Sequence, residues 1–195
     1  AAKLWNDLDN ALTGSPIRIM GPEPNSSAMS DFLELVMSEG CRSVPGMSDL
    51  PEAKRFRACR DIRRDGAFVA GPKHDSMTVD WLRANPGALG LVRYVTFERE
   101  RGRLIAHRIE GVPPDADSVA SGRYPLARPI YLYVKKRHVA WVPGLQNLLY
   151  ALASEREIGP DGYLVAYGLV ALDDIRRNRA RDRALGLEAI QSAAQ

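Results

Sequence analysis

The sequence predicts an α/β fold in which helices flank a mixed sheet. Short apolar runs, such as residues 17–20, stop at glycine or proline and are followed by segments whose apolar residues recur with helical spacing. The composition agrees, because 195 residues with 45% hydrophobic content can bury a core. A charged content of 26% is ordinary for a globular domain and argues against a disordered or fibrous chain.

Strand-like and helix-like segments alternate through the first half of the chain. The predicted elements are, in order, a strand over residues 17–20, a helix opened by Ser26 and Ser27 and ended by Gly40, a helix over residues 52–64, a helix around residues 79–82 that ends near residues 85–87, a strand over residues 88–97, and its partner strand over residues 104–109. Glycine and proline mark most of these boundaries, which is why they can be placed from local sequence.

The second half carries the densest strand signal of the chain. Residues 129–134 read Pro-Ile-Tyr-Leu-Tyr-Val and predict a buried or hinge strand. Residues 142–152 predict a helix with Pro143 in its first turn. From Leu172 onward, a segment with five arginines between Arg176 and Arg183 predicts an exposed terminal helix or frayed end.

Charge and patterning exclude several classes of protein. A formal net charge of +3 is small for a nucleic-acid-binding protein, so no nucleic-acid partner is expected, although the charge permits an anionic ligand. Residues 1–5 lack the pattern of a signal peptide, and no stretch of 18 apolar residues occurs. We therefore expect a soluble chain that, if exported, has already been processed.

Catalytic and metal-binding motifs are absent. The sequence has no Walker loop, no Gly-x-Ser-x-Gly elbow, no His-Glu-x-x-His and no Gly-x-Gly-x-x-Gly. Its three histidines and two cysteines show no ligand spacing, so neither a metal nor a cofactor is expected. A hydrolase that uses His74 beside Asp75 is an alternative, but an exposed loop explains this pair better, and we expect no enzyme.

One local feature favours anion binding. The turn over residues 21–25 ends a strand and leads into a helix opened by Ser26 and Ser27. Free amides, hydroxyls and the helix dipole would meet there, which suits an oxyanion. The alternative is that one of the serines only caps its own helix. Arg63 and Arg64 offer a countercharge, while Cys41 and Cys59 are either a disulfide or two buried thiols.

Motifs along nearly the whole chain resemble the phosphate-binding proteins of bacterial ABC phosphate importers, the PstS-type class II periplasmic solute-binding proteins. The matching stretches are Gly21-Pro22, Ser26-Ser27-Ala28, residues 32–36, Cys59, residues 61–69, residues 85–90, residues 111–114, the Gly-Arg-Tyr-Pro-Leu-Ala-Arg-Pro stretch at residues 122–129, and residues 159–164. They keep the family's order, and residues 122–129 are the most specific of them.

The resemblance implies a type 2 periplasmic-binding-protein-like fold with the first lobe largely missing. Residues 1–122 would form the second lobe, and residues 123–195 a hinge strand and a helical segment that packs on the first lobe. The first lobe's opening segment would lie upstream, and the apolar surface meant for it would favour self-association. Location in the oxidising periplasm implies that Cys41 and Cys59 form a disulfide.

The resemblance also implies a function and a set of ligand-binding residues. Phosphate or a related oxyanion would bind non-covalently in the cleft between two lobes, for delivery to the membrane subunits of an ABC importer. The residues expected to serve are Ser26, Ser27, the amides of Ala28 and Met29, the charge of Arg63, and Asp75.

Departures from the family pattern leave a second interpretation open. Residues 26–30 read Ser-Ser-Ala-Met-Ser where the family has Ser-Gly-Thr-Arg-Asp, residues 73–75 read Lys-His-Asp where it has Glu-Asn-Asp, and Arg93 stands in place of a glycine. The alternative function is a solute-binding-like module without ligand that acts in protein interaction or envelope association.

Overall fold

A computed structural model describes residues 2–189. Internal contacts divide the chain into two compact units, Ala1–Leu104 and Ile105–Gln195. This division falls earlier than the lobe boundary expected at residue 122, which stays a prediction. Within the described residues, every helix is too short or too polar to span a bilayer.

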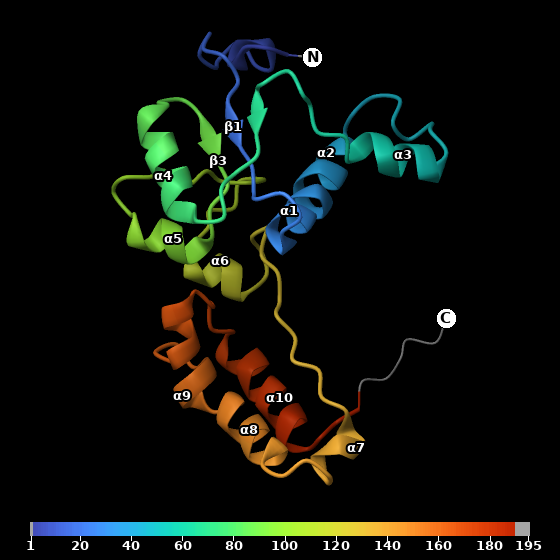
Figure 1. Ribbon diagram of the computed structural model, residues 1–195, viewed down its shortest axis with the longest axis vertical. Coiled ribbons are helices and arrows are strands. Elements are labelled where there is room, and N and C mark those ends of the chain that lie inside the picture. Colours follow the sequence, from blue (N-terminus) through green and yellow to red (C-terminus); the bar gives the residue numbers. More distant parts are fainter. Residues whose placement is uncertain (1, 190–195) are drawn as a thin grey trace. The chain divides into compact units, whose positions relative to one another are not determined.

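The first unit is an α/β arrangement around three short strands (Figure 1). Its elements are η1 (Trp5–Asp7), β1 (Ile19–Met20), α1 (Ser27–Asp31), the π-helical η2 (Phe32–Ser38), α2 (Glu39–Cys41), α3 (Glu52–Cys59), β2 (Phe68–Val69), α4 (Asp75–Ala84), β3 (Leu89–Gly90) and α5 (Tyr94–Arg99). The predicted α/β class is confirmed, and the sheet is parallel throughout rather than mixed.

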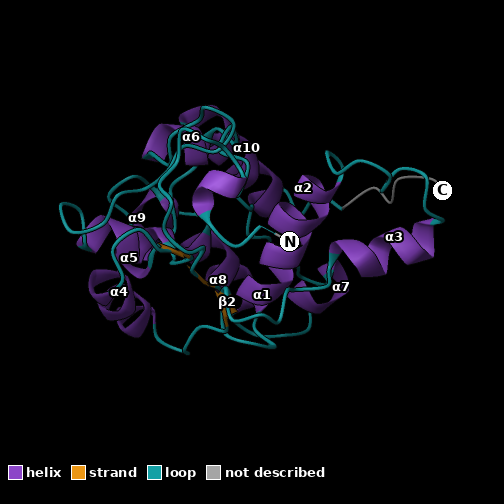
Figure 2. Ribbon diagram, turned by 90° about the horizontal axis from the view of Figure 1, so that it is seen from above, coloured by secondary structure: helices purple, strands orange, loops and turns teal. Residues whose placement is uncertain are grey.

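The sheet has the order β2-β1-β3, with Ile19 in register with Phe68 on one side and Leu89 on the other. Its ladder continues beyond the two-residue strands, since the amide of Gly21 donates to Val69 O at 2.9 Å and that of Leu91 to Met20 O at 3.0 Å. Figure 2 gives a second view of the strands, in orange, turned by 90° from that of Figure 1.

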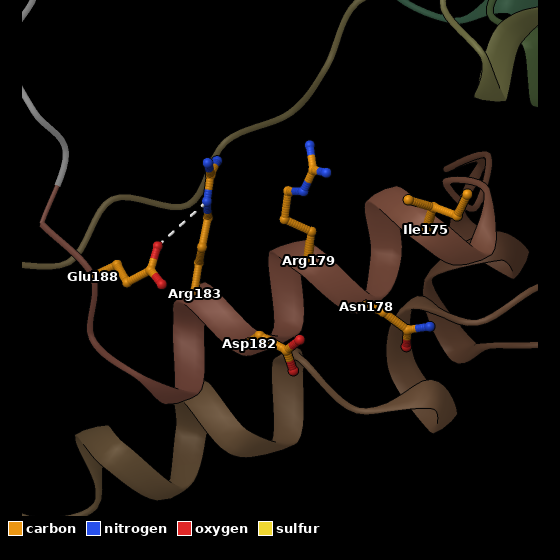
Figure 3. A pocket seen from close by; sticks show the side chains of 6 residues that line it. All are labelled: Ile175, Asn178, Arg179, Asp182, Arg183 and Glu188. Atoms are coloured by element: carbon orange, nitrogen blue, oxygen red, sulfur yellow. Dashed lines mark ion pairs between the residues drawn. The ribbon is translucent and has the colours of Figure 1, made fainter.

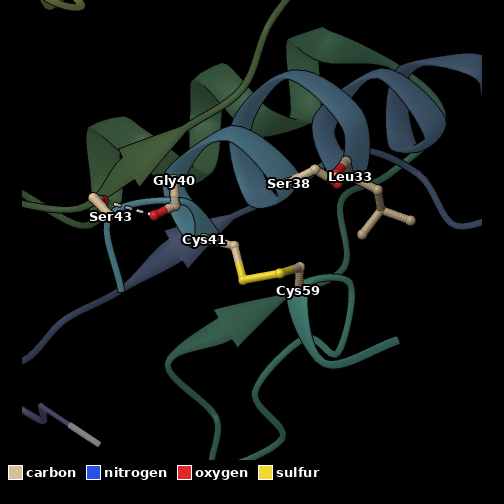
Figure 4. Close-up of a disulfide and its surroundings, with 6 residues drawn as sticks. All are labelled: Leu33, Ser38, Gly40, Cys41, Ser43 and Cys59. Atoms are coloured by element: carbon tan, nitrogen blue, oxygen red, sulfur yellow. Dashed lines mark hydrogen bonds between the residues drawn. A yellow bond between two sulfur atoms is a disulfide. The ribbon is translucent and has the colours of Figure 1, made fainter. Parts of the chain in front are cut away.

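A small core holds this unit together. Its buried apolar residues are Ile17, Met20, Phe32, Cys41, Cys59 and Val79. Phe32 stacks on Phe68 with ring centroids 5.5 Å apart, so η2 packs on the strand β2. The disulfide between Cys41 and Cys59 then joins α2 to the end of α3, which confirms the expected pairing (Figure 4).

The predicted hairpin over residues 88–97 and 104–109 is wrong. Only Leu89–Gly90 is a strand, and Tyr94–Arg99 is the helix α5. Local composition favoured a strand, but the start of α5 is fixed by Asp75, whose carboxylate accepts hydrogen bonds from Arg93 and Thr96. Asp75 precedes Arg93 and Thr96 by 18 residues or more. Its hydrogen bonds to them override the β preference of Val95, Thr96 and Phe97.

The second unit is helical. Its elements are α6 (Ala116–Ala120), α7 (Lys136–Val139), α8 (Leu145–Leu152), α9 (Glu155–Ile158), the 3₁₀ helix η3 (Tyr163–Tyr167) and α10 (Asp174–Leu185). Arg177 of α10 is buried and links three segments, because its guanidinium contacts Glu155 at 3.0 Å, Asp174 at 2.6 Å and the carbonyl of Leu172 at 2.6 Å. Arg176 and Arg181 add to this anchoring of the predicted terminal helix, since Arg176 donates to the carbonyl of Ser121 at 2.7 Å and Arg181 pairs with Glu155 at 3.7 Å.

The predicted hinge strand over residues 129–134 is not formed. Within the described chain these residues pair with no other strand, and Ile130 and Tyr133 are 77% and 71% exposed. A strand gains its stability from hydrogen bonds and side-chain contacts with a neighbouring strand, and residues 105–189 contain no such strand. The strip of exposed apolar residues agrees with the expected self-association, which stays a prediction.

Close backbone packing at the end of the sheet gives a test of this architecture. An ideal Cβ on Gly71 would lie 2.0 Å from the carbonyl oxygen of Gly21, so we expect Gly71→Ala to force the two segments apart and lower the free energy of unfolding by about 2 kcal/mol or more. Urea denaturation measures this loss. Gly40→Ala is the matched control, because its Cβ meets nothing within 4 Å and alanine favours a helix. An equal loss in both variants would contradict the close packing.

Candidate functional site

The carboxyl ends of all three strands lie at one edge of the sheet, and each strand leads into a helix there. β1 leads to α1, β2 to α4, and β3 to α5. Because β1 is central, the chain leaves it toward β2 and later crosses to β3 on its other side. Such a reversal between neighbouring parallel strands is where α/β proteins bind ligands, so this edge is the candidate site.

Ser26 caps the helix that follows β1. Its hydroxyl accepts a hydrogen bond from the amide of Met29 at 3.1 Å and donates one to the carbonyl of Glu23 at 2.6 Å. The capping interpretation of Ser26 therefore holds in the structure. The cap occupies the Met29 amide, whereas the amides of Ser27 and Ala28 have no partner among residues 2–189.

Asp75 lies at the start of α4 and ties it to the start of α5. One carboxylate oxygen accepts hydrogen bonds from the Arg93 amide at 3.1 Å, the Arg93 Nε at 2.8 Å and the Thr96 hydroxyl at 2.7 Å. Burial acts to raise the pKa of Asp75, but the hydrogen bonds from Arg93 and Thr96 outweigh it, so the pKa lies below its usual value. The carboxylate thus stays ionised.

Arg93 is the cation that the structure brings to this edge. Its side chain is 70% exposed although its Nε contacts Asp75, which leaves the rest of the guanidinium open to solvent. The sequence marked this residue only as a departure from a family glycine. Its contact with Asp75 could not be predicted from local sequence, because the two residues are 18 positions apart in the chain.

Arg63 lies elsewhere. It precedes β2, at the amino edge of the sheet, whereas the serines follow β1 at the carboxyl edge. Its guanidinium is held by Asp65 at 2.8 Å from Nε and by the carbonyl of Ala2 at 2.8 Å. The pair with Arg63 lowers the pKa of Asp65 to about 2. The structure therefore brings Ser26–Met29 and Asp75 to one edge and keeps Arg63 apart from them.

The remaining surface features contribute no described contact to the sheet edge. His74 is exposed beside the edge, and no cluster of potential metal ligands occurs among residues 2–189. A hollow on the second unit is lined by α10 and the residues after it (Figure 3). There Arg179 and Arg183 project to one side of the helix, and Glu188 pairs with Arg183 at 3.4 Å. A second hollow lies on α3.

Comparisons with known proteins agree with the resemblance read from the sequence. Residues 1–156 match the family model described as "PBP superfamily domain". The fold is similar to the crystal structure of a possible phosphate binding protein from Planctomyces limnophilus, with a TM-score of 0.66 and 17% identity. The match covers 96% of this chain but 60% of that one, so this chain spans less than two thirds of its structural neighbour. No curated protein matches.

Acid sensitivity tests the bond network of Asp75. Because the folded-state pKa of Asp75 is depressed, its contribution to stability is present above the unfolded pKa and is lost as pH falls through the folded pKa. We expect Asp75→Asn to lower the free energy of unfolding by about 1–2 kcal/mol near neutral pH, with a smaller difference from wild type at about pH 3. Urea denaturation at both pH values measures this.

Asp80→Asn is the control for that experiment. Asp80 is on the same helix, but its side chain is 75% exposed and its ion pair with Arg83 is 3.9 Å long. Such surface pairs contribute little, so Asp80→Asn should leave stability almost unchanged at either pH. A pH-independent loss in Asp75→Asn would contradict a role for the ionised carboxylate.

Proposed function

Because the chain belongs to the PBP superfamily, we propose that it binds phosphate or a related oxyanion, without covalent chemistry, at the carboxyl edge of its parallel sheet. The observation that carries this proposal is the pair of open amides on Ser27 and Ala28, at an edge that also holds the exposed guanidinium of Arg93. Backbone amides at the start of a helix bind oxyanions through the aligned peptide dipoles.

Each residue of the edge takes a distinct role in this proposal. Ser26 fixes the first turn of α1, so that the Ser27 and Ala28 amides point out of the helix toward an anion. Arg93 supplies positive charge, and Asp75 orients it while taking no proton at neutral pH. The sequence suggested Arg63 as the source of positive charge for the anion. We assign this role to Arg93 instead, because Arg63 lies at the opposite edge of the sheet.

The wider role is the substrate-binding component of an ABC-type phosphate importer, located in the periplasm. Three observations support it: the superfamily match, the neighbour's description as a possible phosphate binding protein, and a disulfide of the kind found in oxidising compartments. Binding between two lobes and delivery to importer membrane subunits belong to the proposal. Within it, the chain is a binding protein and not an enzyme.

A second candidate function rests on the capping of Ser26. Its hydroxyl donates to the carbonyl of Glu23 and accepts from the Met29 amide, so two of the expected ligand donors are already used. A solute-binding-like module that has lost its ligand and acts in protein interaction or envelope association accounts for this arrangement.

Thermal unfolding with and without anions tests the first function against the second. A ligand that binds only the folded state raises the unfolding temperature, and about 10 mM phosphate should raise it by roughly 2 °C or more. Differential scanning calorimetry measures the shift, with sulfate as the parallel anion. No shift with either anion would favour the module without ligand.

Ser27→Pro removes one proposed donor while keeping the helix. Ser27 is the first residue of α1, where proline is tolerated, and Ser26 already has the extended backbone (φ −86°, ψ 160°) that precedes proline. We expect this variant to fold and to lose most of the phosphate shift. Ala116→Pro makes the same change at the start of α6 and should keep the shift. Retention of the full shift by Ser27→Pro would exclude the Ser27 amide.

A further inference from the structure

The segment that follows Cys41 and runs just past Cys59 forms a projecting basic finger, defined here as residues 42–60. The disulfide between Cys41 and Cys59 closes it across 18 residues, and Figure 4 shows this link between the helical segment and the end of α3. Within the first unit, α3 extends away from the sheet in both overall views (Figures 1 and 2). Apart from Cys59 itself, all residues of α3 are exposed.

The finger carries an excess of positive charge, most of which has no ion-pair partner among the described residues. Its cations outnumber its acids by five to two; they are Arg42, Lys54, Arg55, Arg57 and Arg60, against Asp49 and Glu52. Arg42 pairs with Glu39 at 2.7 Å. The side chains of Lys54, Arg55 and Arg57 make no ion pair or hydrogen bond with any described residue, and only their backbone groups are bonded, within the turns of α3.

Exposed apolar groups lie among these cations. Phe56 is 57% exposed and Val44 is 45% exposed. Arg60 lies over the Phe56 ring, with its Cζ 4.3 Å from the ring centroid. A shallow hollow beside this stack is lined by Phe56, Arg57, Ala58, Arg60 and Asp61, and the Nε of Arg60 is buried there without a hydrogen-bond partner among the described residues.

We propose that the basic finger binds the surface of an anionic phospholipid membrane. Unpaired cations near a membrane are attracted to its anionic headgroups, and an exposed aromatic ring enters the interface between headgroups and acyl chains. The exposed guanidinium groups of Arg55 and Arg57 suit headgroup phosphates. Exposed Phe56 and Val44 favour a lipid surface over a double-stranded nucleic acid, whose outer surface consists largely of charged phosphates.

Vesicle flotation tests the proposal with the full chain. The probes are vesicles of phosphatidylcholine alone and vesicles with equal parts of phosphatidylglycerol. We expect binding to the anionic vesicles only, and weaker binding as salt rises above about 150 mM. The Lys54→Glu, Arg55→Glu, Arg57→Glu triple variant should bind more than about 100-fold more weakly, and Phe56→Ser about fivefold more weakly.

The matched control reverses three cations in the second unit. Lys135→Glu, Lys136→Glu and Arg137→Glu change the net charge equally in another exposed basic segment, and this variant should keep its vesicle binding. Circular dichroism and thermal unfolding check that both triple variants are folded. Absence of binding to anionic vesicles, or an equal loss in both triple variants, would overturn the proposal. Tighter binding of a single-stranded oligonucleotide, lost in the finger variant, would assign the finger to nucleic acid and overturn it too.

Discussion

The first unit depends on the close approach of two backbone segments at Gly21 and Gly71. The carbonyl oxygen of Gly21 occupies the position that a side chain on residue 71 would need, so residue 71 must be glycine. This close approach lets β1 and β2 stay side by side beyond their ladder, as shown by the Gly71 amide donating to Pro22 O at 3.1 Å. The helices after these strands therefore begin at the same edge. Without it, the Ser26 turn and the Asp75 cluster would belong to separate surfaces.

Elements bounded by local signals could be predicted from the sequence, and those fixed by distant contacts could not. The strand before Gly21-Pro22 and the helix that ends at Asn85 follow from the turn residues themselves. The helix α5 does not, because its start depends on Asp75. Residues 129–134 have strand composition, but composition describes a preference for packing on a neighbour and does not provide the neighbour.

The candidate site shows the same distinction. The capping by Ser26 acts within three residues, and the sequence offered it as one of two interpretations. The Arg63 and Asp65 pair is equally local, and their spacing of two residues was a signal that Arg63 has a partner of its own. Arg93 reaches the edge through the parallel sheet, so its place follows from the order of the strands and not from a motif.

The exposed strip over residues 129–134 has a practical consequence for the study of this protein. Ile130, Tyr131, Leu132 and Tyr133 are all more than 60% exposed in the folded chain. Fluorescent dyes that report unfolding by binding to exposed hydrophobic surface will already bind the native protein at this strip. Their background will be high before heating begins, so melting curves that rely on such dyes will understate any ligand effect that a calorimeter records in full.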